Sequence, residues 1–173
     1  MARKPRIRTK LSRQELPKNF FSVFKKEAEV LANKTTRKAA DRTLERAKEI
    51  IENQEFSWKP LSPEYRKKKK KKGLDLRIFV ATKEYLNKGI GTWESGRRIF
   101  VGPKQGIHKP SGLTYRVLSR ILEFGTWSIP SRPLWRPLAS QILREIPGFR
   151  REYQKGVQRA SKKAASRKRT VKR

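Results

Sequence analysis

The fold is decided by the stretch Leu122-Glu-Phe-Gly-Thr-Trp-Ser-Ile-Pro-Ser-Arg-Pro-Leu-Trp-Arg-Pro137, which holds a complete change of chain direction. Gly125 can end a helix in the left-handed region at little cost. Pro130 disfavours helical angles at the residue before it, so a short extended piece is expected there. Ser131 can cap a new helix with Pro133 in its first turn, where a missing N–H costs little. The stretch therefore predicts a helix, a tight exit, a short strand and a second helix.

Apolar residues at helical spacing flank this stretch on both sides. The stripe before the glycine consists of Tyr115, Leu118, Ile121 and Leu122. The stripe that begins beside Pro133 consists of Leu134, Leu138, Ile142 and Ile146. We expect the second helix to face the core with its stripe and to be interrupted at Pro147-Gly148, because a proline removes a helical hydrogen bond.

A long N-terminal helix is predicted between Asn19 and Asn53, where proline and glycine are absent and apolar residues recur at helical spacing. The polar patch Asn33–Thr36 is a weak point, so the segment is either one helix or two. If it is continuous, ~35 residues at ~1.5 Å each would reach about 50 Å.

The middle of the chain predicts a small antiparallel sheet. Residues 58–63 are rich in proline and indicate a loop, and residues 74–81 favour a strand, with a helix as the alternative. Residues 91–101 predict a hairpin that turns at Glu94-Ser-Gly96, and residues 102–112 indicate an exposed loop. The expected fold class is α+β, with the long N-terminal helix and the C-terminal helix packed on the sheet.

The charge of the chain is extreme. Its 173 residues contain 46 Lys and Arg against 15 Asp and Glu, a formal net charge of +31. A length of this order suits one domain, and so large a positive charge implies a polyanionic partner, most commonly nucleic acid. Cysteine is absent from the sequence, which excludes disulfides and thiolate metal sites.

Three basic clusters divide the chain into an N-terminal arm (1–17), a single α+β domain (18–158) with a basic loop (66–72), and a C-terminal tail (159–173). Blocks of like charge repel themselves, so we expect them to be poorly ordered without a partner. The cations predicted to contact DNA or an acidic partner are Arg3, Lys4, Arg6, Arg8, Arg66, Lys67, Lys68, Lys69, Lys70, Lys71, Lys72, Arg167, Lys168 and Arg169.

The residues that commonly carry catalysis are few and scattered. His108 is the single histidine and has no acid within ten residues on either side, so it is interpreted as a solvated loop residue, because a metal site needs several convergent ligands. Glu123 is interpreted as a structural carboxylate near a helix end, paired with Arg132 or Arg136. We therefore expect no catalytic residues, no metal, no cofactor and no membrane insertion.

Tryptophans at joints between elements are more often core or interface anchors than stacking platforms for bases. Trp127 and Trp135 are assigned on this basis to the core or to an interface, whereas Trp58 and Trp93 stay unassigned. The predicted subunit or neighbour interface consists of Phe124, Gly125, Trp127, Ile129, Pro130, Arg132, Pro133, Trp135 and Arg136.

The motif Leu-Glu-Phe-Gly-Thr…Ile-Pro-x-Arg-Pro-φ-x-Arg-Pro resembles the signature of the small tail-completion proteins (neck or minor tail components) of tailed bacteriophages. Upstream, Trp58-Lys-Pro-Leu-Ser-Pro-Glu-Tyr65, the lysine run, Ala81-Thr82…Tyr85-Leu86 and Val101-Gly102 are similar to further parts of the pattern. The similarity extends from about Trp58 to Leu143, roughly half of the chain.

This resemblance implies a structural protein of the virion neck that forms a homo-oligomeric ring around the DNA passage. The implied partners are a portal-side adaptor or stopper, a tail terminator or tube, and genomic DNA. The implied location is the virion, and the host cytoplasm during assembly. The main alternative is a non-specific nucleic-acid-binding protein of ribosomal or DNA-compacting type, which the charge alone favours, and a nuclease is a distant third.

Overall fold

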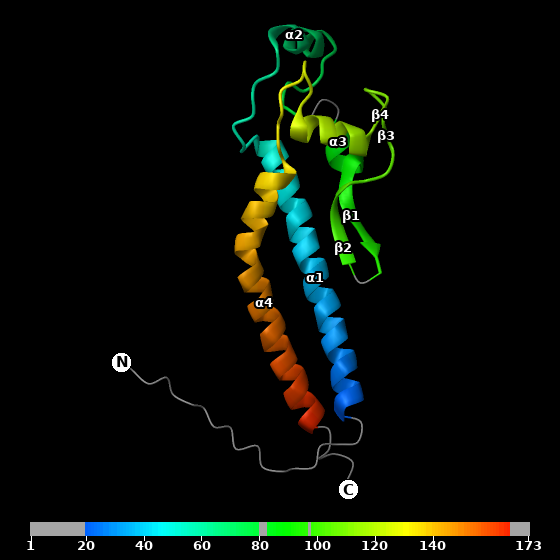
Figure 1. Ribbon diagram of the computed structural model, residues 1–173, viewed down its shortest axis with the longest axis vertical. Coiled ribbons are helices and arrows are strands. Elements are labelled where there is room, and N and C mark those ends of the chain that lie inside the picture. Colours follow the sequence, from blue (N-terminus) through cyan, green and yellow to red (C-terminus); the bar gives the residue numbers. More distant parts are fainter. Residues whose placement is uncertain (1–19, 80–82, 97, 167–173) are drawn as a thin grey trace, which may run out of the picture.

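The computed structural model describes residues 20–79, 83–96 and 98–166 as a long helical stem that carries a small α+β head (Figure 1). The stem consists of α1 (Phe20–Asn53) and α4 (Trp135–Ser166), which lie side by side and antiparallel. The head contains α2 (Pro63–Lys71), a π-helical turn (Tyr85–Gly89), β1 (Ile90–Ser95), β2 (Arg98–Pro103), β3 (Ile107–His108), β4 (Leu113–Thr114) and α3 (Tyr115–Phe124). The predicted α+β class, with long first and last helices, is confirmed.

The first helix is continuous, which decides between the two alternatives that the sequence left open. The weak point at Asn33–Thr36 stays helical, and the Thr36 hydroxyl donates to the Ala32 carbonyl oxygen one turn back (2.8 Å). Farther along, α1 buries Ala47, Ile50 and Ile51. The long helix is therefore stabilised by its neighbours, as expected for a helix whose sequence has only a weak apolar face.

The last helix differs from its prediction in two places. It runs through Pro147 and Gly148 without a break, and it continues to Ser166 although the basic tail was predicted to begin at residue 159. Ala160 and Ala164 are buried, and the backbone at Gly156 lies against the side chain of Leu31. Close packing on α1 thus accompanies the extension of the helix beyond residue 159. Ile146, by contrast, was predicted to face the core and is exposed.

Two short antiparallel ribbons make up the sheet structure of the described residues. The predicted hairpin is confirmed, since β1 pairs with β2 in a register that sets Trp93 opposite Phe100. The rings of these two residues stack on each other on an exposed face of the hairpin. An ion pair between Arg37 and Glu94 ties this hairpin to α1. The predicted loop at residues 102–112 is wrong in part, since it contains β3, which pairs with β4.

The strand predicted at residues 74–81 is wrong for residues 74–79, which are irregular, and residues 80–82 lie outside the described part. The physical reason is that polar side chains form hydrogen bonds with the backbone of these residues. The Asp75 carboxylate accepts from the Arg77 amide (2.8 Å), and Lys69 Nζ donates to the carbonyl oxygens of Asp75 and Arg77 (2.8 and 2.9 Å). These groups are not free to pair with a neighbouring strand.

The core lies where the stem meets the head. Its fully buried side chains are Ile50, Ile51, Leu86, Ile90, Leu134 and Leu138. Tyr85 and Tyr115 belong to the same cluster. None of the helices in the described ranges is long and apolar enough to cross a bilayer.

Burial of the Tyr85 hydroxyl raises the pKa of this group to about 12. Because the pKa is raised in the folded state, the neutral phenol favours folding below pH 10, and this contribution is lost as the pH rises through about 12. We expect the free energy of unfolding to fall by about 2 kcal/mol across this window through Tyr85. Denaturant titrations from pH 9 to 12 should show a flatter profile for Tyr85→Phe than for the wild type, and equal slopes would contradict this assignment.

Candidate assembly interface

Helix α3 ends at Gly125, as predicted. Gly125 has φ +77°, and its amide donates to the Ile121 carbonyl oxygen (2.7 Å). A Cβ at this position would lie 2.8 Å from the backbone of both Ile129 and Ser131. The chain can therefore fold back closely on itself only because residue 125 has no side chain. We refer to residues 125–134, which connect α3 to α4, as the crossover.

The crossover contains neither the predicted strand nor the predicted helix start. Helix α4 begins at Trp135, after Pro133, and Ser131 does not cap it. The Glu123 carboxylate performs this role: it accepts from the amides of Leu134 (2.8 Å), Trp135 (3.0 Å) and Arg136 (3.1 Å). The next residue, Pro137, has no N–H to satisfy. One buried carboxylate thus accepts the free amide donors in the first turn of α4. Its negative charge also interacts favourably with the positive end of the helix dipole.

Glu123 was predicted to be structural, and that interpretation is confirmed, but its partners are backbone amides rather than arginine side chains.

Arg132 was assigned to an interface and is instead buried, with only 5% of its surface exposed. Its guanidinium donates to the carbonyl oxygens of Lys59 (3.0 Å) and Pro60 (3.3 Å). Nearby, Trp58 Nε1 donates to the Pro133 carbonyl oxygen (2.8 Å). These contacts fasten the proline-rich loop to the crossover, so Arg132 acts within the subunit.

The tip of the crossover, Thr126–Pro130, is a braced turn. The Thr126 amide donates to the Ile129 carbonyl oxygen (2.8 Å), and the Ile129 amide donates to Thr126 Oγ1 (3.0 Å). Trp127 stands on this turn with its side chain fully exposed (100%). An indole that is left in water on a rigid turn is the kind of group that anchors an interface.

Four of the nine predicted interface residues are exposed, and together we call them the tip patch: Phe124, Trp127, Ile129 and Arg136. Phe124 and Ile129 are 58% and 37% exposed. The Arg136 guanidinium lies over the Phe124 ring, 4.6 Å from its centroid. The patch is therefore apolar with a cation at its edge.

Of the other five predicted interface residues, Arg132 is buried and the remaining four are partly exposed. Trp135 is half-buried, and its Nε1 donates to Ser119 Oγ (2.9 Å). Gly125, Pro130 and Pro133 are half-buried in the crossover. These residues shape and support the patch rather than belong to it.

The basic loop predicted at residues 66–72 is a helix. Ser62 caps α2 by accepting from the Tyr65 amide (3.3 Å), and Pro63 occupies the first turn. Lysine is a good helix former, and the basic residues in the last turn of α2 favour the helix dipole. Local capping therefore outweighs the repulsion from which disorder was predicted.

Lys69 is the exception among these cations, since it is buried. Its ammonium donates to two backbone carbonyl oxygens, and burial lowers its pKa. The Asp75 carboxylate raises that pKa, and the charge of Arg132 lowers it. The remaining cations of the run, Arg66, Lys67, Lys68, Lys70, Lys71 and Lys72, are exposed. Figure 1 shows α2 and the crossover at the same end of the molecule.

Arg3, Lys4, Arg6, Arg8, Arg167, Lys168 and Arg169 lie outside the described residues.

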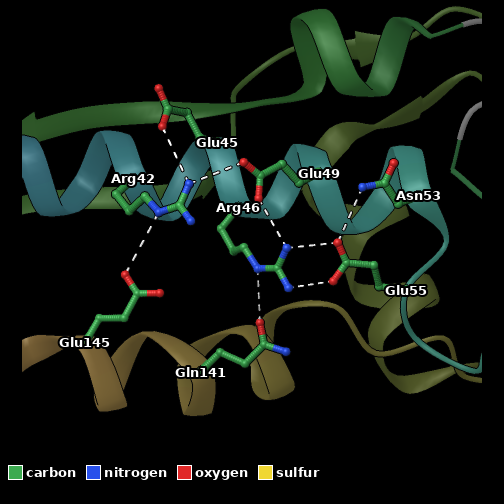
Figure 2. Close-up of polar contacts among 8 residues, drawn as sticks. All are labelled: Arg42, Glu45, Arg46, Glu49, Asn53, Glu55, Gln141 and Glu145. Atoms are coloured by element: carbon green, nitrogen blue, oxygen red, sulfur yellow. Dashed lines mark hydrogen bonds and ion pairs between the residues drawn. The ribbon is translucent and has the colours of Figure 1, made fainter.

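A polar network that was not predicted from the sequence runs along the stem, as Figure 2 shows. Arg42 on α1 faces Glu49 (3.3 Å) on its own helix and Glu145 (4.0 Å) on α4. Arg46 pairs with Glu55 (2.5 Å) and donates to Gln141 of α4 (3.4 Å).

Hydrogen bonding to Arg46 lowers the pKa of Glu55. Arginines four residues apart on α1 share one face of the helix, which is the signal that could have predicted the network.

His108 was predicted to be solvated and is buried, with Nδ1 2.8 Å from Ser111 Oγ. Within residues 20–79, 83–96 and 98–166, no group of three or more His, Cys, Asp or Glu side chains could hold a metal ion. Comparison with models of protein families, with curated proteins and with solved structures finds no match to this chain.

Proposed function

We propose that the chain is a structural, non-enzymatic component of the neck of a tailed bacteriophage, where it assembles through the tip patch into a ring around the DNA passage. The single observation that carries the proposal is Trp127, a fully exposed indole on a turn that is braced from within the subunit. A rigid segment loses little entropy when it docks, so such a turn is suited to repeated assembly contacts.

The resemblance to tail-completion proteins gains support from the roles of the motif residues. Gly125 permits the fold-back, Glu123 caps α4, and Arg132 fastens the loop behind the crossover. These three residues build the turn that presents Trp127. A motif whose residues together shape one exposed turn fits a protein whose task is docking.

The cationic helix α2 supports a place beside DNA. The helix and its C-cap residue Lys72 present six exposed cations at the same end of the molecule as the crossover. Cations of this kind can replace condensed counterions on a duplex without reading its sequence. Acidic faces of neighbouring neck proteins could use the same charges.

Trp127→Ala is expected to block the assembly of tailed particles while the subunit stays folded, because the side chain makes its contacts outside the subunit. The measurement is the yield of infectious particles, with electron microscopy of filled heads and circular dichroism of the purified variant. Phe21→Ala is the matched control, since it removes an exposed aromatic ring at the far end of the stem. A normal yield of infectious particles from Trp127→Ala would overturn the proposal.

A non-specific nucleic-acid-binding protein is the second candidate, and the exposed cations of α2 favour it. If about six phosphates are neutralised, log K should fall with log salt at a slope of roughly −5. Replacing Lys67, Lys68, Lys70 and Lys71 with Gln should make this slope shallower by roughly 3–4 units without changing sequence preference. Lys25→Gln/Lys26→Gln on the stem should have a smaller effect. An unchanged slope in the α2 variant would remove α2 from the DNA-binding surface.

A further inference from the structure

The stem carries a groove that the proposed function does not use. It lies between α1 and α4 and has a volume of about 580 Å³. Seven of its eight lining residues are charged, and Phe149 is the one aromatic ring among them. A cavity of about 150 Å³ holds a benzene molecule, so this groove has room for an indole and a neighbouring side chain. We refer to it as the stem groove.

Three of the acids in this strongly basic chain, Asp41, Glu45 and Glu145, line the stem groove. Glu45 and Glu145 each lie 4.0 Å from Arg42, at the outer limit of an ion pair, and both side chains are exposed. Four cations also line the groove, and two of them, Arg37 and Lys38, are engaged with Glu94 and Glu152. The three carboxylates of the groove outnumber the remaining two cations, Lys34 and Arg42, by one, so the groove can accept one further cation from outside.

The tip patch has the complementary character, since it combines a projecting indole with the exposed guanidinium of Arg136. We propose that the tip patch of one subunit docks in the stem groove of a second copy of this chain, with Trp127 in the groove and Arg136 at its carboxylates. This inference deepens the proposed function, on which it rests, by naming the contact between neighbouring subunits.

The tip patch and the stem groove lie at different positions along the length of the stem. The crossover is at the head end of the stem, and Asp41 and Glu45 are roughly 15 Å farther along α1, at ~1.5 Å per residue. A contact between two different surfaces is heterologous, so each subunit keeps one free tip patch and one free groove until the assembly closes. Such a contact produces a ring or a filament, but not an isolated two-fold dimer.

The first test measures the mass of the purified full chain by light scattering across a range of concentrations. Salt of roughly 0.3 M screens the self-repulsion of so basic a chain. The wild type should self-associate, and Trp127→Ala should weaken association roughly 30-fold or more, as expected for a hot-spot residue. Asp41→Lys/Glu145→Lys should weaken it too without disturbing the fold, since both side chains are exposed. Phe21→Ala should associate like the wild type.

The second test mixes two defective variants. Trp127→Ala lacks the tip but keeps the groove, and Asp41→Lys/Glu145→Lys lacks the groove but keeps the tip. Mixed in equal amounts, they should form one-to-one dimers that neither variant forms alone and that cannot grow. A two-fold contact between like surfaces would give no such rescue, and absence of the mixed dimer would overturn the inference.

The tests also separate this inference from the proposed function. A wild-type chain that stays monomeric at every concentration would overturn the docking of copies. If Trp127→Ala nevertheless abolished tailed particles, the proposed function would stand with another neck protein as the occupant of the tip patch. If Trp127 fluorescence were quenched by single-stranded DNA but not by heparin, the occupant would be nucleic acid and the inference would fail.

Discussion

Glu123→Ala should lower the free energy of unfolding by about 3 kcal/mol or more, because it leaves three backbone amides at the start of α4 without their acceptor. Glu123 and Leu134 are both buried, so water cannot readily replace the lost carboxylate. The loss exceeds that of an ordinary helix cap, which costs about 1 kcal/mol, since this side chain serves three donors and also joins α3 to α4. Urea denaturation followed by circular dichroism would measure it.

Two variants sharpen this experiment. Glu123→Gln keeps one acceptor oxygen and should lose less stability than Glu123→Ala. Glu64→Ala removes an exposed acid from the first turn of α2, where a favourable dipole contact is worth under about 1 kcal/mol. If Glu123→Ala cost no more than Glu64→Ala, the carboxylate would not be the cap of α4.

Gly125→Ala should lower the free energy of unfolding by about 2–4 kcal/mol, because a side chain at φ +77° is strained and its Cβ would meet backbone atoms of Ile129 and Ser131 at 2.8 Å. Backbone atoms cannot rotate away as a flexible side chain can, so the tip has to shift. The variant should therefore also weaken any contact made by Trp127. Thermal unfolding measures the first effect, and the assembly assay measures the second.

Gly148→Ala is the matched control for this substitution. Gly148 lies inside α4, and a Cβ there would meet nothing within 4 Å. Alanine at such a site is expected to stabilise the protein by roughly 0.5–1 kcal/mol. If Gly125→Ala were as well tolerated as Gly148→Ala, the crossover would not depend on close backbone approach.

Local chemistry made part of this fold predictable from the sequence. The end of α3 at Gly125 and the β1–β2 hairpin were predicted from residues whose backbone preferences are strong. The start of α4 was not, because its cap comes from Glu123, which belongs to the preceding helix. A capping group eleven residues away from its amide leaves no short-range pattern.

Which of the nine predicted interface residues are exposed could not be read from the sequence. Trp127 and Arg132 are both large residues of the same short segment, yet one is fully exposed and the other is buried against the carbonyl oxygens of Lys59 and Pro60. That distinction depends on a loop some 70 residues upstream. In the same way, Lys69 could not be separated from its neighbouring lysines before its hydrogen bonds to the carbonyl oxygens of Asp75 and Arg77 were known.

The length of the stem separates two groups of exposed cations within the described residues. The exposed lysines of α2 lie at one end, and Lys25 and Lys26 lie near the start of α1 at the other (Figure 1). A helix of 34 residues spans about 50 Å. Duplex DNA rises 3.4 Å per base pair, so a duplex that runs along the stem would pass both groups within roughly 15 base pairs. With the function proposed above, the stem would act as a spacer that sets the footprint of one subunit on a polyanion.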